Sequence, residues 1–347
     1  MTPIAIAGRP IGPGHPPYVI AEMSGNHNGD IGRALALIDA AKAAGADAVK
    51  LQTYTADTIT IDHDGPGFVI EGGLWDGRRL YELYQEAHTP WDWHPRLFAH
   101  AAQMGIACFS SPFDPTAVAF LQELGAPAFK VASFEIVDTP LVAAMARCGK
   151  PLIISTGLAS PQDITEAVAA ARDAGGTEIV LLHCTSGYPT PASQMHLRTM
   201  LDLGKHGTLV GLSDHTMGTA VSVAAVAVGA CVIEKHFCLA RADGGPDAAF
   251  SLEPDELARL VADCRDAWEA LGEVHYEEVS AEAASRDHRR SLYVVADVRQ
   301  GDLLTEANVR SIRPGFGLAP KHLYEVLGKV AVRDLKRGEP LDWEMVG

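Results

Sequence analysis

The sequence predicts a closed (β/α)8 barrel followed by a small α+β domain at its C-terminal end. Between residues 18 and 275, short apolar runs alternate with helical patterns about eight times, as in successive βα units. The apolar runs are continuous, which is typical of parallel strands covered on both faces. The first βα turn lacks a GxGxxG motif, which disfavours the alternative, an open doubly wound sheet.

The predicted elements follow one another in the order that a barrel requires. The expected strands cover residues 18–21, 48–51, 106–109, 128–131, 152–155, 179–183, 209–212 and 232–235. A first helix begins at Ile31 and ends near Gly45, and later helices cover residues 94–104, 115–124, 139–147, 161–174, 195–204, 219–228 and 254–271. An aromatic-rich loop, expected to contain no regular element, follows the second strand.

The composition changes after the predicted barrel, which places a domain boundary there. We assign residues 1–272 to the barrel, the highly charged residues 273–290 to a partly helical linker, and residues 291–347 to a small domain with short strands and a helix near residues 320–327. So short a domain has a marginal core, and we expect it to depend on contacts with another part of the protein.

The charge and the cysteines exclude several classes of protein. There are 28 Lys and Arg against 44 Asp and Glu, and the net charge of −16 argues against binding to nucleic acid or to an anionic membrane. The six cysteines form no CxxC pair, which favours reduced thiols. The sequence begins with no secretory signal pattern, and its longest apolar run, residues 220–233, is too short to span a bilayer. We expect a cytoplasmic protein.

Polar residues follow nearly every predicted strand, and in a barrel these positions form one site. Lys50 and Lys130 follow apolar strand residues, so we expect them at the barrel mouth, where they suit a phosphate or a carboxylate. The hydroxyl groups expected beside them belong to Ser111, Ser133, Ser155 and Ser213. Two alternatives remain: a lysine exposed at the surface, or a lysine that forms a Schiff base as in class I aldolases.

Two histidines end neighbouring strands. His215 and His236 follow the seventh and eighth predicted strands, and two neutral imidazoles suit a divalent metal that keeps open coordination positions. The alternative is that each is an ordinary histidine of the rim. Near the C-terminus, Arg313 precedes a Pro-Gly turn and is a candidate anion ligand, although an ordinary turn explains the spacing equally well.

These motifs together resemble the sialic acid synthase family. The segments that carry the resemblance are IAEMSGNHNG (20–29), KLQTYT (50–55), SSPFD (110–114), KVASFE (130–135), ISTG (154–157), GLSDHT (211–216) and IEKHF (233–237). The C-terminal residues around Arg313 are similar to that family's antifreeze-protein-like (SAF) domain. Within the family the likeness is closest to pseudaminic acid synthases, through LYELYQEA (80–87) and RADGGPD (241–247). Gly187 departs from the pattern, because a polar residue is common there.

The resemblance implies a transferase of carbohydrate biosynthesis. Phosphoenolpyruvate would condense with the open-chain aldehyde of 2,4-diacetamido-2,4,6-trideoxy-L-altrose, releasing phosphate and forming a nine-carbon 2-keto acid. His215 and His236 would hold manganese or magnesium, which polarises the aldehyde, and Glu22 and Glu135 would orient the sugar or activate water. The lysines and serines above would bind phosphoenolpyruvate. The residues implied to contact the sugar are Gln52, Tyr54, Tyr188, Asp247 and Arg313.

The resemblance also implies a homodimer in which the C-terminal domain of one subunit covers the active site of the other. Three alternative functions remain open at this point. The first is the synthesis of N-acetylneuraminic or legionaminic acid by the same chemistry, and the second is a Schiff-base aldolase. The third is a carbohydrate- or ice-binding protein with an inactive barrel, which the intact set of polar strand ends disfavours.

Overall fold

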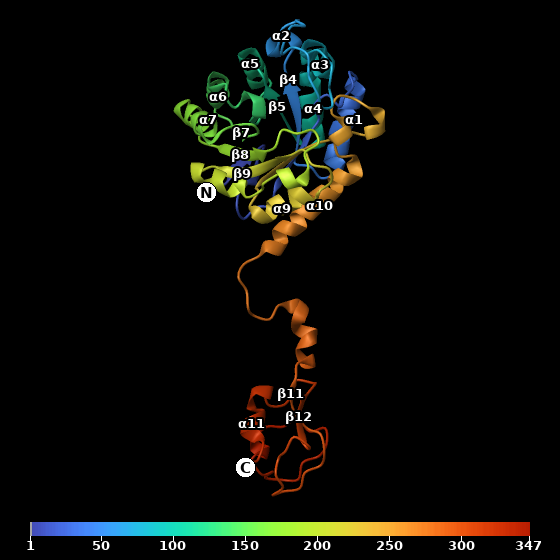
Figure 1. Ribbon diagram of the computed structural model, residues 1–347, viewed down its shortest axis with the longest axis vertical. Coiled ribbons are helices and arrows are strands. Elements are labelled where there is room, and N and C mark those ends of the chain that lie inside the picture. Colours follow the sequence, from blue (N-terminus) through green and yellow to red (C-terminus); the bar gives the residue numbers. More distant parts are fainter. Residues whose placement is uncertain (1) are drawn as a thin grey trace. The chain divides into compact units, whose positions relative to one another are not determined.

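The computed structural model describes residues 2–347, and the chain divides into two compact units, Met1–Gly272 and Glu273–Gly347. In the first unit, eight parallel strands of the described residues form a closed barrel in the order β10-β3-β4-β5-β6-β7-β8-β9, surrounded by helices (Figure 1). The predicted (β/α)8 barrel is therefore confirmed.

The barrel strands lie close to their predicted positions. They are β3 (Tyr18–Glu22), β4 (Ala48–Thr53), β5 (Ala107–Pro112), β6 (Phe129–Val131), β7 (Leu152–Ser155), β8 (Ile179–Cys184), β9 (Leu209–Asp214) and β10 (Val232–His236). The helices between and after them are α1 (Ile31–Ala43), α4 (His94–Met104), α5 (Pro115–Glu123), α6 (Thr139–Ala146), α7 (Pro161–Asp173), α8 (Thr199–Leu203), α9 (Ala220–Val228) and α10 (Pro254–Leu271). The helix expected over residues 195–204 is shorter, with single 3-10 turns on both sides of α8.

Alternate side chains of each strand point to opposite faces, which divides the apolar residues between two layers. Val19, Ala21 and Ile233 belong to the layer packed against the outer helices. Tyr18 and Ile20, on the same strand as the first two, belong to the cluster inside the barrel. Each strand therefore supplies both layers, and its continuous apolar run is explained by burial on both faces.

An N-terminal hairpin covers the N-terminal end of the barrel. Strands β1 (Ile4–Ile6) and β2 (Arg9–Ile11) pair antiparallel, and Ile4, Ile6 and Ile11 are buried in the interior cluster. The sequence analysis did not predict these strands, because three residues are too few to establish a periodic pattern. The hairpin excludes water from one end of the barrel interior.

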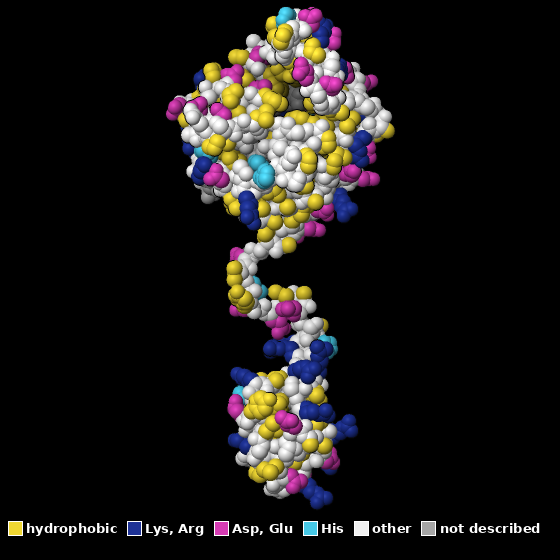
Figure 2. All heavy atoms as spheres, viewed as in Figure 1, with side chains coloured by type: hydrophobic (Ala, Val, Ile, Leu, Met, Phe, Trp, Pro, Cys, Tyr) yellow, Lys and Arg dark blue, Asp and Glu magenta, His cyan; other side chains and the backbone are white. Residues whose placement is uncertain are grey.

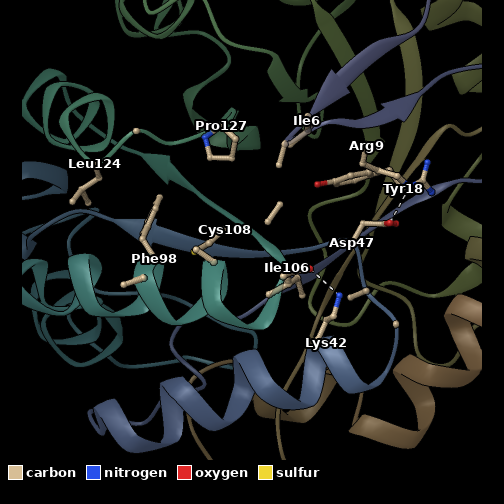
Figure 3. A pocket seen from close by; sticks show the side chains of 18 of the residues that line it. Ile6, Arg9, Tyr18, Lys42, Asp47, Phe98, Ile106, Cys108, Leu124 and Pro127 are labelled. Carbon is tan, nitrogen blue, oxygen red and sulfur yellow. Dashed lines mark hydrogen bonds and ion pairs between the residues drawn. The ribbon is translucent and has the colours of Figure 1, made fainter.

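A cavity of about 850 Å³ lies beside this hairpin, at the N-terminal ends of the strands (Figure 3). Its charged groups already have partners, whereas the buried hydroxyl of Tyr18 in its wall has none among the described residues. Lys42 Nζ donates to the carbonyl oxygen of Gly105 at 2.8 Å, and Arg9 Nε donates to Asp47 Oδ1 at 3.1 Å. Most of the remaining wall is apolar, so the cavity lacks the convergent polar groups of a catalytic site.

The long connection between β4 and α4 contains two short helices where the sequence analysis expected only a loop. They are α2 (Ala56–Ile59) and α3 (Leu80–Ala87), and Leu83 is the one buried residue of α3. Trp75, which lies between the two helices, donates its indole N–H to the carbonyl oxygen of Pro246 at 2.9 Å. This bond attaches the connection to the segment that follows β10.

The C-terminal unit has its own small core. It contains a 3-10 helix (Ser280–His288), an antiparallel pair of strands, β11 (Ser291–Val294) and β12 (Val309–Ile312), and α11 (Leu323–Val326) within the predicted helical region. Buried apolar side chains such as Leu292, Leu304 and Leu335 form one cluster. Across residues 2–347, no helix is both long enough and apolar enough to cross a membrane.

The hairpin should make a measurable contribution to stability. Replacing Ile6, which is fully buried, by alanine leaves a cavity and should lower the free energy of unfolding by about 3 kcal/mol. Urea unfolding followed by circular dichroism measures the loss. Ala5→Ser, at the exposed position between Ile4 and Ile6, is the control and should change stability by less than about 0.5 kcal/mol. Equal effects of the two substitutions would contradict the packing described here.

Candidate active site

The alternation that builds the core also brings polar side chains together at the C-terminal ends of the strands. Apolar side chains inside the barrel include those of Ile20, Ala48 and Val232. On each of these three strands the residue two positions further along points inward as well, and it is polar. The inward residues at this level are Glu22, Lys50, Gln52, Ser111, Lys130, Ser155, Cys184, Ser213 and Glu234. The strand register places Glu22 beside both Lys50 and His236.

Two lysines and two glutamates form a buried charge cluster. Lys50 Nζ lies 2.5 Å from Glu22 Oε2 and 3.7 Å from Glu234 Oε1. Lys130 Nζ lies 3.9 Å from the same Glu234 oxygen. Lys50 is 3% exposed and Lys130 is 1% exposed, so the alternative of surface lysines is wrong. The two positive and two negative charges neutralise one another, because ionised side chains can be buried only with a counterion nearby.

Serine hydroxyl groups complete the cluster. Lys50 Nζ donates to Ser111 Oγ at 3.2 Å, and Lys130 Nζ donates to Ser155 Oγ at 2.6 Å. Ser213 Oγ donates to Glu234 Oε1 at 3.2 Å. The fourth predicted serine, Ser133, is buried just after β6, and its Oγ accepts a hydrogen bond from the backbone N–H of Gly157. The structure thus brings together the predicted lysines and three of the four serines in direct contact.

Burial shifts the protonation equilibria of this cluster. It raises the pKa of Glu22 to about 7, although Lys50 acts in the opposite direction. Burial also lowers the pKa of Lys130 below its ordinary value, and Glu234 opposes that shift. For Glu234, burial acts upward on the pKa, but Lys130 and Lys50 outweigh it and hold the pKa below the ordinary value. Glu22 is therefore the member of the cluster that can exchange a proton near neutral pH.

Glu234 and Cys184 were not among the predicted site residues. Glu234 contacts both lysines, and its position two residues before His236 on one strand was the signal that it shares the inward face. Cys184 was predicted only to be one of six reduced thiols, and its Sγ lies 3.8 Å from Ser186 Oγ and 3.8 Å from His215 Nδ1. A cysteine at the end of an apolar strand gives no sequence signal that distinguishes a core position from one at the site.

The two predicted histidines lie side by side, with ring centroids 5.4 Å apart. His215 Nδ1 is 3.1 Å from the carbonyl oxygen of Thr185, and because a carbonyl only accepts, the proton is on Nδ1 and the lone pair on Nε2. His236 keeps 11% of its side chain exposed, and burial together with the charge of His215 lowers its pKa well below the ordinary value. Burial lowers the pKa of His215, but Cys184 and the carbonyl oxygen of Thr185 outweigh it and hold that pKa above its ordinary value, so a metal ion would displace a proton from Nε2.

The chemistry of this pair fits a divalent metal ion. Among residues 2–347, His236 Nδ1 is a buried nitrogen without a hydrogen-bond partner, and the nearest carboxylate oxygen, Asp247 Oδ2, is 3.8 Å away. The hydrogen bond from His215 to Thr185 is the kind of contact that orients a metal-binding imidazole. No group of three or more His, Cys, Asp or Glu within residues 2–347 is arranged to hold a metal. Two histidines would leave the other positions to water and substrate.

Aromatic side chains cover the histidine pair. The Tyr188 ring lies 4.5 Å from that of His215, and the Phe250 ring lies 4.9 Å from that of His236. Trp75 continues this wall, with its ring 5.6 Å from that of Tyr188. Sequence analysis predicted Tyr188 as a sugar contact but not Trp75 or Phe250, which lie on connections far apart in the sequence.

The other predicted sugar contacts lie at the same end of the barrel. Gln52 Nε2 donates to Glu22 Oε1 at 3.0 Å, and Asp247 accepts a short hydrogen bond from Ser24 Oγ. Tyr54 is buried after β4, where its ring contacts those of Tyr84 and Phe113. Tyr54 therefore makes its observed contacts with other aromatic rings.

Glu135 ends a 3-10 turn that follows β6. Its Oε2 is buried without a hydrogen-bond partner among the described residues, and burial raises its pKa to about 7, against the effect of Lys130. A carboxyl group with this pKa can both donate and accept a proton near neutral pH. Glu22 and Glu135 are thus two groups suited to acid-base chemistry.

Arg313 lies in the C-terminal unit, not in the barrel. It is exposed and forms no ion pair with any residue between 2 and 347. The turn that carries it is fixed by Ser291, whose Oγ donates to the carbonyl oxygen of Pro314 at 2.7 Å and accepts from the N–H of Gly317 at 2.9 Å. A Cβ at Gly317 would lie 2.2 Å from the carbonyl oxygen of Leu292, so glycine is required there.

Comparison with known proteins identifies the family. The NeuB family model matches residues 37–276, and the SAF domain model matches residues 289–347. The chain is 44% identical over 325 residues to a pseudaminic acid synthase of Campylobacter jejuni, covering 93% of this chain and 95% of that protein. It is 37% identical to an N,N'-diacetyllegionaminic acid synthase of the same species, covering 92% and 97%.

A solved structure agrees with these relatives. The crystal structure of an N-acetylneuraminic acid (sialic acid) synthetase from Leptospira borgpetersenii, in complex with citrate, superimposes with a TM-score of 0.73 at 31% identity. The match covers 82% of this chain and 95% of that one. With a barrel of this architecture, a C-terminal SAF domain and relatives similar over nearly their whole length, the chain belongs to the NeuB family.

Proposed function

We propose that this protein is a pseudaminic acid synthase, which condenses phosphoenolpyruvate with 2,4-diacetamido-2,4,6-trideoxy-L-altrose and releases phosphate. The observation that carries the proposal is the buried cluster of Lys50 and Lys130 with serine hydroxyl groups, at the same barrel end as the adjacent pair of histidines. The similarity to pseudaminic acid synthases over 93% of the chain supports the choice of sugar.

The lysine cluster is suited to the two anionic groups of phosphoenolpyruvate. Lys50 and Lys130 supply point charges, and Ser111 and Ser155 already lie within hydrogen-bond distance of them. When Glu22 takes up a proton, for which its pKa of about 7 is suited, the four-residue cluster gains one net positive charge. The binding of an anion then replaces an internal counterion, and the lysines remain compensated.

The carbon chemistry follows from two partners held at one barrel end. C3 of phosphoenolpyruvate attacks the sugar aldehyde, whose oxygen takes up a proton, and the positive charge left at C2 accepts water. The added water loses one proton to give a C2 hydroxyl group, and as the C2–O bond to phosphate breaks the hydroxyl proton passes to the departing phosphate, which leaves the 2-keto acid. Glu22 and Glu135, both with a pKa of about 7, are the groups suited to move these protons.

We further propose that His215 and His236 hold a divalent metal, manganese or magnesium. Bound there, such an ion acts as a Lewis acid toward a carbonyl oxygen. The hydrogen bond from His215 to Thr185 supports the proposal, because it fixes the tautomer that leaves Nε2 free. Tyr188, whose ring contacts both histidine rings, would orient the sugar beside them.

A Schiff-base aldolase is the second candidate function, and one observation favours it. Burial lowers the pKa of Lys130, which increases the neutral amine that such a mechanism needs. However, Lys130 Nζ already donates to Ser155 Oγ and to the carbonyl oxygen of Val131. These two bonds hold the amine as a donor, which suits an anion-binding role better.

We also propose a homodimer in which the C-terminal unit of one subunit covers the barrel mouth of the other. Within that unit the SAF domain, residues 289–347, contains ten Lys and Arg against eight Asp and Glu, a charge of +2, whereas the barrel, residues 1–272, contains 17 against 31, a charge of −14. Residues 273–288 are acidic and bring the whole C-terminal unit to −2. Figure 2 shows the basic side chains spread over the C-terminal unit. Opposite charges favour such an association.

Exposed apolar side chains on both units support the same association. Phe134, Val137 and Leu158, on the connections after β6 and β7, are 61%, 62% and 75% exposed. In the C-terminal unit Phe316 is 63% exposed and lies three residues after Arg313. Contact between such groups would bury apolar surface and bring Arg313 to the sugar.

We also propose a cytoplasmic location. The six free thiols of the described chain suit a reducing compartment such as the cytoplasm.

A phosphate-release assay with a panel of amino sugars tests the activity. We expect the highest kcat/KM with 2,4-diacetamido-2,4,6-trideoxy-L-altrose, at least about tenfold above the sugars that lead to N-acetylneuraminic or legionaminic acid. Chelation should abolish turnover, and manganese or magnesium should restore it. Preference for another sugar would reassign the substrate, and full activity after exhaustive chelation would exclude the metal. Borohydride with substrate should trap no adduct, since trapping would indicate an aldolase.

Substitution of either cluster lysine should weaken phosphoenolpyruvate binding. Lys50→Met or Lys130→Met removes a charge-assisted donor and should raise the KM for phosphoenolpyruvate about 10–100-fold, with a smaller effect on the KM for the sugar. Steady-state kinetics measure both constants, and circular dichroism verifies folding. Lys150→Met, at an exposed position before β7, is the matched control and should change neither constant. An unchanged KM for phosphoenolpyruvate in both cluster variants would refute the assignment.

Mixing two inactive variants tests whether Arg313 acts in the partner subunit. His236→Ala and Arg313→Ala each damage one component of the site. If Arg313 acts across subunits, each co-refolded heterodimer contains one site with both residues, and up to about a quarter of wild-type activity should return. The control is each variant refolded alone, which should stay inactive. No recovery in a sample shown to contain heterodimers would reject the exchanged arrangement.

A further inference from the structure

A second buried ion pair lies on the outer face of the strands that carry the two histidines. Lys235 Nζ is 2.8 Å from Asp214 Oδ2, and each of the two residues is 1% exposed. The two residues face each other in the register of β9 and β10. Because side chains alternate along a strand, they point away from the barrel interior, and Asp214 Oδ2 also accepts a hydrogen bond from Ser222 Oγ of α9 at 2.6 Å.

This pair also fixes the backbone that follows β9. Asp214 Oδ1 accepts a hydrogen bond from the N–H of Thr216 at 2.8 Å, and Lys235 Nζ donates to the carbonyl oxygen of Thr216 at 2.6 Å. Both polar groups of the Thr216 backbone are thus held by the two charged side chains. The only residue between Asp214 and Thr216 is His215.

The position of His215 explains why such an anchor is needed. The hydrogen-bonded pairing of β9 with β10 ends at Asp214, so His215 lies just beyond the sheet, and its own carbonyl accepts one bond, from the N–H of Thr190 at 3.0 Å. His236, in contrast, is still paired with Glu22 of β3. One histidine is therefore held by the sheet, and the other depends on contacts outside it.

We infer that Lys235 and Asp214 are positioning residues that fix the imidazole of His215 relative to that of His236, and thereby set the affinity of the pair for a divalent metal. Each charged residue immediately precedes one of the histidines. Two apolar side chains would fill the same space without the cost of burying charge, but they would leave the backbone of Thr216 unpaired. The inference rests on the metal site of the proposed function.

Three variants of the full-length protein separate positioning from stability. Lys235→Met and Asp214→Asn each leave one buried charge without its counterion, and each should lower the melting temperature by about 10 °C. The double variant Asp214→Asn/Lys235→Met removes both charges and should recover most of that loss. Its Mn²⁺ affinity, measured by electron paramagnetic resonance of free Mn²⁺, should nevertheless stay about 10–100-fold below that of the wild type, because the carbonyl oxygen of Thr216 loses its donor Lys235 and only the N–H of Thr216 keeps a partner, the amide oxygen of residue 214.

An ion pair at the opposite end of the barrel, more exposed than Lys235–Asp214, provides the control. Arg9 Nε and Asp47 Oδ1 are 3.1 Å apart beside the N-terminal hairpin (Figure 3). Asp47 Oδ2 also accepts from the N–H of Val19. Asp47→Asn should lower the melting temperature and leave the Mn²⁺ affinity unchanged. The KM for phosphoenolpyruvate should change by less than about twofold in the double variant, because neither substituted residue belongs to the lysine cluster.

The outcomes are distinguishable. If the double variant regains wild-type Mn²⁺ affinity together with its melting temperature, the pair has only a structural role and the inference is wrong. If Asp47→Asn lowers Mn²⁺ affinity as much as the double variant, the effect is a general loss of stability and the inference is again wrong. If the wild type binds Mn²⁺ no more tightly than His215→Ala, the two-histidine site itself fails, and the positioning role fails with it.

Discussion

The compensation of four buried charges is the constraint on which the site depends. One barrel interior contains all four side chains, those of Lys50, Lys130, Glu22 and Glu234. Burying an unpaired ion there would cost roughly several kcal/mol. Their pairing keeps both lysines inside the mouth while the strands below them pack as an apolar core. In the proposed function an anionic substrate enters as the cluster releases a counterion, and the raised pKa of Glu22 suits a protonation step near neutral pH.

The two-residue period of the strands distributes chemistry between two faces. On β10, Glu234 and His236 face the interior, whereas Lys235 between them faces the outer helices and pairs with Asp214. Motifs such as IEKHF are therefore two interleaved sets of residues. In the proposed function one set contacts the reactants and the other set supports the strand from the outer face, which explains why four adjacent residues, 234–237, are polar or aromatic at the end of an otherwise apolar run.

The two-residue alternation of side chains also explains which elements and site residues could be predicted from the sequence. The barrel strands and the lysines were predicted because apolar runs followed by polar residues are strong local patterns. The hairpin at Ile4–Ile11 and helix α3 were not, because three-residue strands and a helix with one buried residue have almost no pattern. Cys184 and Phe250 reach the site through connections whose paths depend on tertiary packing. The role proposed for Arg313 requires an association between subunits, which no local pattern in one chain encodes.

In the proposed function, chemistry and sugar recognition are carried by different parts of the protein. The lysine cluster and the histidines lie on or next to strands, where the hydrogen-bonded sheet limits their movement. Trp75, Tyr188 and Phe250 lie on connections, and Arg313 lies on a turn of the other unit. Substitutions in connections disturb a barrel less than substitutions in its strands. A family built this way can keep one phosphoenolpyruvate reaction and change its sugar, because the loops that contact the sugar bear little of the load that holds the barrel closed.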